Sequence, residues 1–209
     1  YLTASAQLPV VSSIYASPAV PAVLADDELG GYLLGAHLLD RGHRHVLHFM
    51  TRANLIHAHR LDGLARAYLE RGLSAEHYLH YCTWWQPFGR DDAARDWVWD
   101  ALRQGLHAYP KTTVIMAPND RAAVQFAEVL ALRGMRVPEQ ISLTGYDDTH
   151  CLTNADGENT LTTVRVPLEE IGREAARLIL RELAGEAARD TRIVLPVHLI
   201  ERGSVSRLG

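Results

Sequence analysis

The chain has 209 residues, 47% of them hydrophobic and 22% charged, and its formal net charge is −4. This composition is typical of a globular protein of one or two domains. The positive charge is almost entirely arginine scattered along the chain, so nothing indicates nucleic-acid binding by this segment, which needs clustered basic residues. No apolar run approaches the ~18–20 residues that span a bilayer. The first residues lack a signal-peptide pattern, and we therefore expect a cytoplasmic protein with no membrane contact.

Strands and helices alternate along almost the whole chain, as short apolar runs followed by amphipathic stretches. The expected strands are residues 8–15, 20–24, 45–50, 78–83, 112–116, 141–144, 161–164 and 193–201. The expected helices are residues 27–41, 58–70, 90–107, 120–133 and 167–183. Helices between successive strands imply crossover connections and therefore parallel sheets. So many strands exceed one small two-layer domain, and we expect an α/β protein with two half-domains.

Residues typical of helix ends support these boundaries. Asp27 is placed to cap the helix that follows it, and Pro167 occupies a first-turn position where proline is tolerated. Gly42, Gly134 and Gly185 each follow the end of an expected helix, where glycine is favoured.

Polar side chains follow two neighbouring strands at the point where each strand ends. Asn119 comes after the strand at 112–116, and Asp147 and Asp148 come after the strand at 141–144. The carboxyl ends of parallel strands meet at one edge of the sheet, where open α/β sheets bind small ligands. We interpret this β-α-β unit as part of a small-molecule site.

Structural roles are the alternative for each of these residues. Asn119 could cap the helix that begins at Asp120, and Asp147 or Asp148 could cap the next turn. Two adjacent residues at a strand end usually point to opposite sides, so a shared proton between the two carboxyl groups is not expected.

Seven short motifs occur in order along the chain. The motifs are Asp26-Asp27-x-x-Gly30 with His37-Leu38 and Gly42-His43-Arg44, Arg60-Leu61-Asp62-Gly63-Leu64 with Tyr68, Asn119-Asp120, Val137-Pro138 with Ile141-Ser142, Gly145-Tyr146-Asp147-Asp148, Leu161-Thr162-Thr163-Val164, and Leu195-Pro196 with Leu199-Ile200-Glu201-Arg202-Gly203-Ser204. In their order and spacing they resemble the lactose/galactose-repressor (LacI/GalR) family of transcription regulators, and the first of them resembles the family stretch D-N-x-x-G.

The resemblance implies a periplasmic-binding-protein-like fold, with two Rossmann-like lobes joined by three strand crossovers. Residues 26–160 and 193–209 would form the C-terminal lobe, and residues 1–25 and 161–192 would form part of an incomplete N-terminal lobe. The helix-turn-helix headpiece of the family is absent from this chain, so we do not expect the chain itself to bind DNA.

The family resemblance also implies a cleft between the lobes lined by Arg60, Asp147 and Asn119. Arginine, carboxylate and amide groups offer the fixed hydrogen bonds that hold a polar ligand. Arg60 could instead be an exposed helical residue paired with Asp62 or Glu70.

Trp84 and Trp85 follow an expected strand, and either could form a flat plate for a sugar ring or fill the core.

The match to the family is weakest near the N-terminus, where Ile14 stands at a position at which the family commonly has Asp. Val166 likewise replaces a residue that is polar in some sugar-binding members. Either the effector is less polar than a free sugar, or Ser12 and Ser13 supply the missing hydrogen bonds.

Other chemistry has little support. The close histidine pairs, such as His57 and His59, lack a further ligand at metal-binding spacing, so neither a metal site nor a cofactor is expected. Cys82 and Cys151 are read as free thiols. No nucleophile elbow or phosphate loop occurs, and we do not expect an enzyme.

The sequence therefore predicts the effector-sensing, dimerising domain of a bacterial transcription regulator that binds a sugar or related polar molecule. The headpiece of a full-length protein would contact DNA, and the domain itself would form a homodimer. The alternative with nearly the same fold is a solute-binding protein of a transport system.

Overall fold

The computed structural model describes residues 8–16, 20–51, 55–84, 91–186 and 191–209. The chain divides into two compact units. Unit 1 comprises Tyr1–Asp26 and Pro167–Val197, and unit 2 comprises Asp27–Val166 and His198–Gly209. The sequence places its lobe boundaries after residues 25, 160 and 192.

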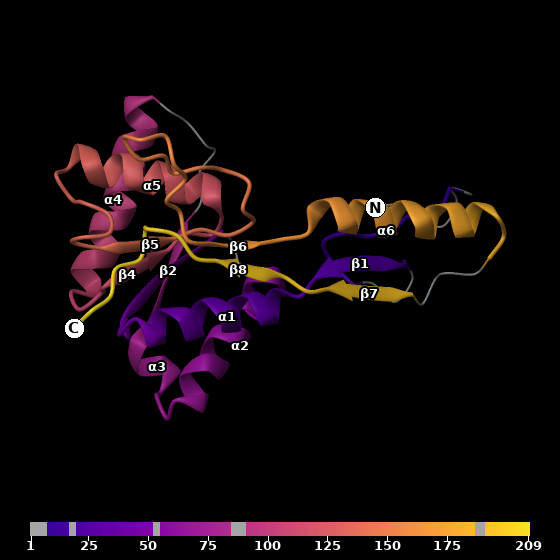
Figure 1. Ribbon diagram of the computed structural model, residues 1–209, viewed down its shortest axis with the longest axis horizontal. Helices are drawn as coiled ribbons and strands as arrows, with labels where there is room; N and C mark the ends of the chain where they lie inside the picture. Colours follow the sequence, from indigo (N-terminus) through magenta and orange to yellow (C-terminus); the bar gives the residue numbers. More distant parts are fainter. Residues whose placement is uncertain (1–7, 17–19, 52–54, 85–90, 187–190) are drawn as a thin grey trace. The chain divides into compact units, whose positions relative to one another are not determined.

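Unit 2 contains a four-stranded parallel sheet in the order β3-β2-β4-β5. Its strands are β2 (Val46–Thr51), β3 (Leu79–Trp84), β4 (Val114–Met116) and β5 (Ser142–Thr144). The helices α1 (Asp27–Asp40) and α2 (Leu55–Glu70) lie on one side of this sheet, and α4 (Asp92–Ala108) and α5 (Asp120–Leu132) on the other (Figure 1). A single turn, α3 (Ala75–Tyr78), precedes β3. The parallel strands expected from the crossover helices are confirmed.

The main core of unit 2 lies between the sheet and α4 and α5. Leu47 and Phe49 point into it from β2, and Phe126 of α5 meets Phe49 edge to face with ring centroids 5.0 Å apart. His48, between them in sequence, faces the opposite side because side chains alternate along a strand. The side that α1 and α2 cover is therefore more polar than the main core.

The helices α1 and α2 approach each other closely through glycines. A Cβ atom on Gly31 would lie 1.9 Å from the carbonyl oxygen of Arg60, and one on Gly63 would lie 1.8 Å from that of Glu28. Neither backbone position can accept a larger residue without moving the helices apart. This contact fixes where the first turns of α2 place Arg60.

Unit 1, as described, contains a parallel pair of strands and one helix. The strand β1 (Ala22–Ala25) pairs with β7 (Arg192–Leu195), with Ala22 opposite Arg192. The helix α6 (Leu168–Leu183) packs on β1 and buries Ile171 and Leu178 (Figure 1).

The C-terminal segment completes unit 2. The strand β8 (His198–Ile200) pairs antiparallel with β6 (Thr163–Arg165). The buried ring of His43 lies 3.0 Å from the carbonyl oxygen of Ser206 and 3.1 Å from the hydroxyl of Ser142, at the amino end of the sheet. These contacts fasten the last residues to the sheet.

Two strand predictions are wrong. The segment 8–15 makes only an isolated bridge, Ser12 to Ala22, because the Ser12 hydroxyl accepts a hydrogen bond from the Tyr15 backbone and turns the chain. The expected strand 193–201 is broken after Leu195, since Pro196 has no N–H to donate to a ladder. Its second half, β8, is antiparallel rather than parallel. Among the described residues, no helix has the length and apolar character required to cross a membrane.

Candidate functional site

Arg60, Asn119 and Asp147 all belong to unit 2, at the carboxyl end of its sheet. Arg60 Nε donates to Asp27 Oδ1 at 2.8 Å, and Arg60 Nη1 donates to the Pro118 carbonyl at 3.0 Å. Only 11% of the Arg60 side chain is exposed, so the alternative of an exposed residue paired with Asp62 or Glu70 is wrong. Asp27, expected as a helix cap, instead begins α1 and pairs with Arg60.

The ring of Tyr146 supports the guanidinium of Arg60. The Arg60 Cζ atom lies 3.4 Å from the ring centroid, in the geometry of a cation–π contact. Burial raises the pKa of the Tyr146 hydroxyl, and the hydroxyl lies so close to α1 that a Cβ on Gly30 would collide with it. Arg60 is therefore held by Tyr146 against one face of its guanidinium and by Asp27 at its edge.

The third nitrogen of the Arg60 guanidinium, Nη2, lies nearest Asp147. Arg60 Nη2 is 3.9 Å from Asp147 Oδ1, which is too long for a direct hydrogen bond. The Asp147 side chain is 34% exposed, and its carboxylate accepts no hydrogen bond from the described part of the chain. Burial raises the pKa of Asp147, and the Arg60 charge opposes that rise. The two groups together leave one donor and one acceptor side by side.

The backbone at Asp147 and Asp148 is unusual. Both residues have positive φ, 98° and 56°, a region that L side chains rarely occupy. Backbone bonds hold the turn, since Asp147 N–H donates to Val164 at 2.8 Å and Val166 N–H donates to Asp147 at 3.4 Å. Left-handed non-glycine residues cluster at binding sites, where the surrounding structure stabilises them.

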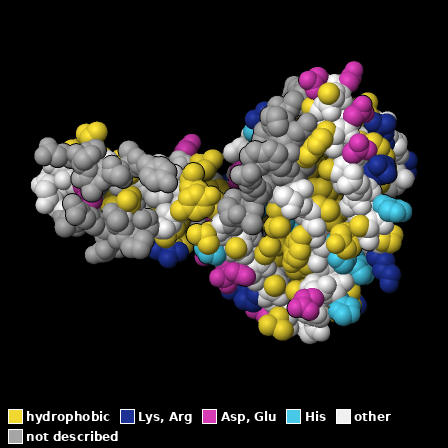
Figure 2. All heavy atoms as spheres, turned by 180° about the vertical axis from the view of Figure 1, so that it is seen from behind, with side chains coloured by type: hydrophobic (Ala, Val, Ile, Leu, Met, Phe, Trp, Pro, Cys, Tyr) yellow, Lys and Arg dark blue, Asp and Glu magenta, His cyan; other side chains and the backbone are white. Residues whose placement is uncertain are grey.

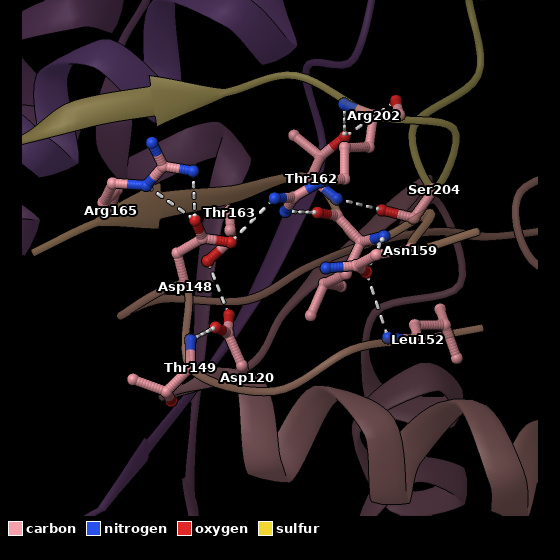
Figure 3. A network of polar contacts seen from close by, with 11 residues as sticks. Asp120, Asp148, Thr149, Leu152, Asn159, Thr162, Thr163, Arg165, Arg202 and Ser204 are labelled. Carbon is pink, nitrogen blue, oxygen red and sulfur yellow. Dashed lines mark hydrogen bonds and ion pairs between the residues drawn. The ribbon is translucent and has the colours of Figure 1, made fainter. Parts of the chain in front are cut away.

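Asp148 anchors this turn through ion pairs with two arginines. Its carboxylate bridges Arg165 of β6 at 2.7 Å and Arg202 at 2.8 Å (Figure 3). Burial acts to raise the pKa of Asp148, but hydrogen bonds and charge from the two arginines outweigh it and the pKa is lowered. The two adjacent carboxyl groups therefore have different partners, Arg60 for Asp147 and two other arginines for Asp148.

Asp120 forms the other anchor. It is fully buried at the start of α5, where Oδ1 accepts from the Thr163 hydroxyl at 2.5 Å and Oδ2 accepts from Thr149 N–H at 2.7 Å (Figure 3). Burial raises the pKa of Asp120 from 3.8 to about 6, although both hydrogen bonds favour the charged form.

A pH-dependent stability follows from Asp120. A carboxyl group with a higher pKa in the folded state binds protons more tightly there, so the contribution of Asp120 to folding stability should become more favourable as the pH is lowered from about 7 to 4. A rise of about two pKa units corresponds to roughly 3 kcal/mol. In urea unfolding at pH 8 and pH 5, the parent should gain stability relative to Asp120→Asn at the lower pH. A stability difference that is the same at both pH values would contradict this assignment.

Asn119 has the structural role considered as the alternative. Its side chain accepts a hydrogen bond from Ala122 N–H at 2.9 Å and caps α5. The amide nitrogen is left over for other partners, and Asn119 is half-buried. Its part in ligand binding stays a prediction.

Two histidines lie behind Arg60, and both are neutral near neutral pH. Burial, with a smaller contribution from the Arg60 charge, lowers the pKa of His48 to about 3 and that of His57 to about 4. Their rings are 6.0 Å apart. No positive charge from these rings therefore adds to that of Arg60.

The other predicted site residues are not assembled with Arg60 by the described structure. Trp84 ends β3, but its side chain lies outside the described residues, as does all of Trp85. Ser13 is exposed and belongs to unit 1. These three remain predictions.

Unit 2 also has hollows elsewhere. One of about 500 Å³ lies between β3 and α4, and one of about 710 Å³ lies beside the end of α5. Figure 2 shows hydrophobic side chains gathered on one face of this unit. Neither hollow is lined by Arg60 or Asp147.

Within the described ranges, no group of three or more His, Cys, Asp or Glu side chains is arranged to hold a metal ion. Cys82 and Cys151 are free thiols.

Sequence reasoning missed three contributors to the site. Asp27 resembled a helix cap, Tyr146 was read only as part of a motif, and Pro118 contributes a carbonyl that no side-chain pattern reveals. Because Asp27 and Arg60 are 33 residues apart, only the pairing of α1 with α2 brings them together. The departure of Asp27 from the family stretch was the one available signal.

Comparisons with known proteins identify the family of this chain. The family "Periplasmic binding protein-like domain" matches residues 36–205. The arabinose metabolism transcriptional repressor of Geobacillus stearothermophilus is 31% identical over 205 residues, which is 96% of this chain and 49% of the repressor. The transcriptional regulator CelR of Thermobifida fusca is 30% identical over 176 residues, 84% of this chain and 49% of CelR. The chain thus spans about half the length of these curated relatives.

Solved structures of sugar complexes are similar as well. A LacI-family regulator from Enterococcus faecium with bound ribose has a TM-score of 0.78 at 25% identity, covering 95% of this chain and 70% of that one. The CelR–cellobiose complex has a TM-score of 0.72 at 29% identity, covering 90% and 55%. The chain therefore belongs to the periplasmic-binding-protein-like domain family, in the form found in LacI-family transcription regulators.

Proposed function

We propose that this chain is the effector-sensing domain of a bacterial transcription regulator, and that its effector is a sugar or a related polyhydroxyl molecule. Arg60 and Asp147 are its principal ligand contacts, with Asn119 beside them. Units 1 and 2 correspond to the two lobes expected from the sequence, and Trp84, Trp85 and Ser13 are further candidate contacts.

The gap between Arg60 and Asp147 carries this proposal. At 3.9 Å, Arg60 Nη2 and Asp147 Oδ1 do not bond each other, yet a single hydroxyl oxygen between them can accept from the first and donate to the second. A hydroxyl does both at once, which a carbonyl or an ammonium group cannot do. Charge-assisted hydrogen bonds of this kind are stronger than neutral ones.

The function is sensing rather than chemistry. The relatives are transcriptional repressors and regulators, which favours a sensor over a transport protein. Ligand binding would favour one arrangement of the domain, and a coupling of about 1–3 kcal/mol would then change the DNA affinity of a headpiece on the same protein. We further propose a cytoplasmic homodimer, no catalytic turnover and no cofactor.

A thermal-shift screen of the full-length protein tests the proposal. The probes are D-ribose, L-arabinose, cellobiose and sucrose, with purine bases as a contrasting class. A ligand at 100 times its dissociation constant should add about 2.7 kcal/mol of stability. We expect at least one sugar to raise the unfolding temperature and to remain chemically unchanged. A response to purine bases alone, or conversion of the sugar to product, would contradict the proposal.

A further inference from the structure

Asp27 departs from the family stretch that it otherwise resembles. The stretch D-N-x-x-G carries a neutral amide at the position where this chain has a carboxylate. That carboxylate is 12% exposed and lies 2.8 Å from Arg60 Nε. Arg60 is therefore paired with a full negative charge before any ligand arrives.

Asp27 and Asp147 flank the guanidinium of Arg60 at 2.8 and 3.9 Å, so within the described part of the chain its positive charge is balanced by carboxylates. Two nearby arginines, Arg165 and Arg202, both contact Asp148. The neighbouring imidazole of His57 is neutral. A phosphate or carboxylate placed beside Arg60 would thus meet two carboxylates and one cation.

Several hydrogen-bond donors that the structure describes at this edge already have partners. A helix N-terminus is an anion site when its N–H groups are free. At α5, however, the Asn119 side chain occupies the N–H of Ala122. The buried carboxylate of Asp120 takes the N–H of Thr149. Arg60 Nη1 is bonded to the Pro118 carbonyl.

We infer that Asp27 is a specificity-determining residue: it neutralises Arg60 in advance, so that the site takes uncharged polyhydroxyl ligands and rejects anionic ones such as sugar phosphates and sugar acids. The inference rests on the proposed function for the position of the ligand. The charge balance itself is a property of this chain and can be tested without knowing the effector.

The test compares full-length parent, Asp27→Asn and Glu28→Gln proteins. The amide introduced by Asp27→Asn would keep an oxygen acceptor for Arg60 Nε and remove only the charge. Glu28→Gln is the control. It also removes one negative charge, but from the next residue, whose exposed side chain pairs with Arg66. Each protein is titrated with inorganic phosphate, D-ribose and D-ribose 5-phosphate at constant ionic strength, because screening by salt would otherwise mimic competition.

We expect Asp27→Asn to bind inorganic phosphate and ribose 5-phosphate at least about tenfold more tightly than the parent, a change of about 1.4 kcal/mol. Glu28→Gln should bind phosphate as the parent does. Equal phosphate affinity in all three proteins, or an equal gain in both variants, overturns the inference.

The sugar arm separates this inference from the proposed function. If Asp27→Asn gains phosphate affinity while no neutral sugar binds the parent, the charge assignment stands and the proposed effector class fails. If a neutral sugar binds the parent and Asp27→Asn gains nothing, the proposed function stands and the role of Asp27 fails.

Discussion

Replacing Arg60 with alanine is expected to abolish the thermal shift produced by any sugar that binds the parent protein. In the proposed site the guanidinium would be the ligand's donor, and it is also the counter-ion of Asp27 and Asp147. Losing one charge-assisted hydrogen bond costs about 1.5–3 kcal/mol, and the carboxylates left behind offer the ligand acceptors but no donor. We expect at least a roughly hundredfold loss of affinity, which 2.7 kcal/mol represents.

The same substitution should also destabilise the unliganded protein. Breaking a buried ion pair by removing one partner typically costs about 3–5 kcal/mol, because the other charge stays buried without compensation. Differential scanning fluorimetry without ligand measures this loss, and the ligand response is then read relative to each variant's own baseline.

Two further variants decide whether the effect belongs to the site. Arg66→Ala, further along α2, removes an exposed arginine and should respond to ligand as the parent does. Asp147→Ala should lose the shift as Arg60→Ala does, since it removes the acceptor from the same gap. If Arg60→Ala and Asp147→Ala both keep the full ligand response, the site assignment is wrong.

Replacing Gly31 with alanine is expected to produce a large loss of stability outside the main core. The new methyl group would lie 1.9 Å from the backbone oxygen of Arg60, and a backbone carbonyl cannot turn aside as a side chain can. Overpacking costs about 1–3 kcal/mol and more where backbone must move. We expect about 3 kcal/mol or more, which lowers the unfolding temperature by roughly 10 °C in a chain of this size.

Gly172→Ala provides the matched control for this prediction. Gly172 lies in α6, and a Cβ atom there would meet nothing within 4 Å. Alanine is favoured over glycine in helix interiors by about 1 kcal/mol, so this change should raise stability slightly. A small gain at both glycines would show that α1 and α2 do not pack as closely as described. The methyl group introduced at position 31 would also press on the backbone of Arg60, so Gly31→Ala should weaken ligand binding as well.

The architecture of unit 2 was predictable because its signals are local. Apolar runs bounded by polar residues located β2, β4 and β5, and the helices between them required parallel pairing. The failures were also physical. Around Ser12 a side-chain hydrogen bond competes with strand pairing in residues 8–15. At Pro196 the missing N–H ends the expected strand 193–201. Neither effect changes the hydrophobic pattern that the prediction used.

The sequence predicted residues of the candidate site, but it did not predict the contacts between them. Polar residues after parallel strands located Asn119 and Asp147, and the family resemblance added Arg60. The partner of Arg60 depends on how α1 and α2 pack, which the periodicity of the sequence does not encode. Asp27 was therefore interpreted as a helix cap. The contact of Tyr146 with Arg60 was missed for the same reason. Asn119 shows the reverse case, since its capping bond follows from local sequence alone.

The route of the chain between the units has a consequence for its synthesis. The backbone leaves unit 1 after Asp26, returns at Pro167 and leaves again after Val197. The partner of β1 is not made until residue 192, and the residues that fasten the amino end of the other sheet come later still. On the ribosome, β1 therefore lacks its partner strand until residues 192–195 have emerged, and the amino end of the sheet of unit 2 stays open until Ser206 has emerged.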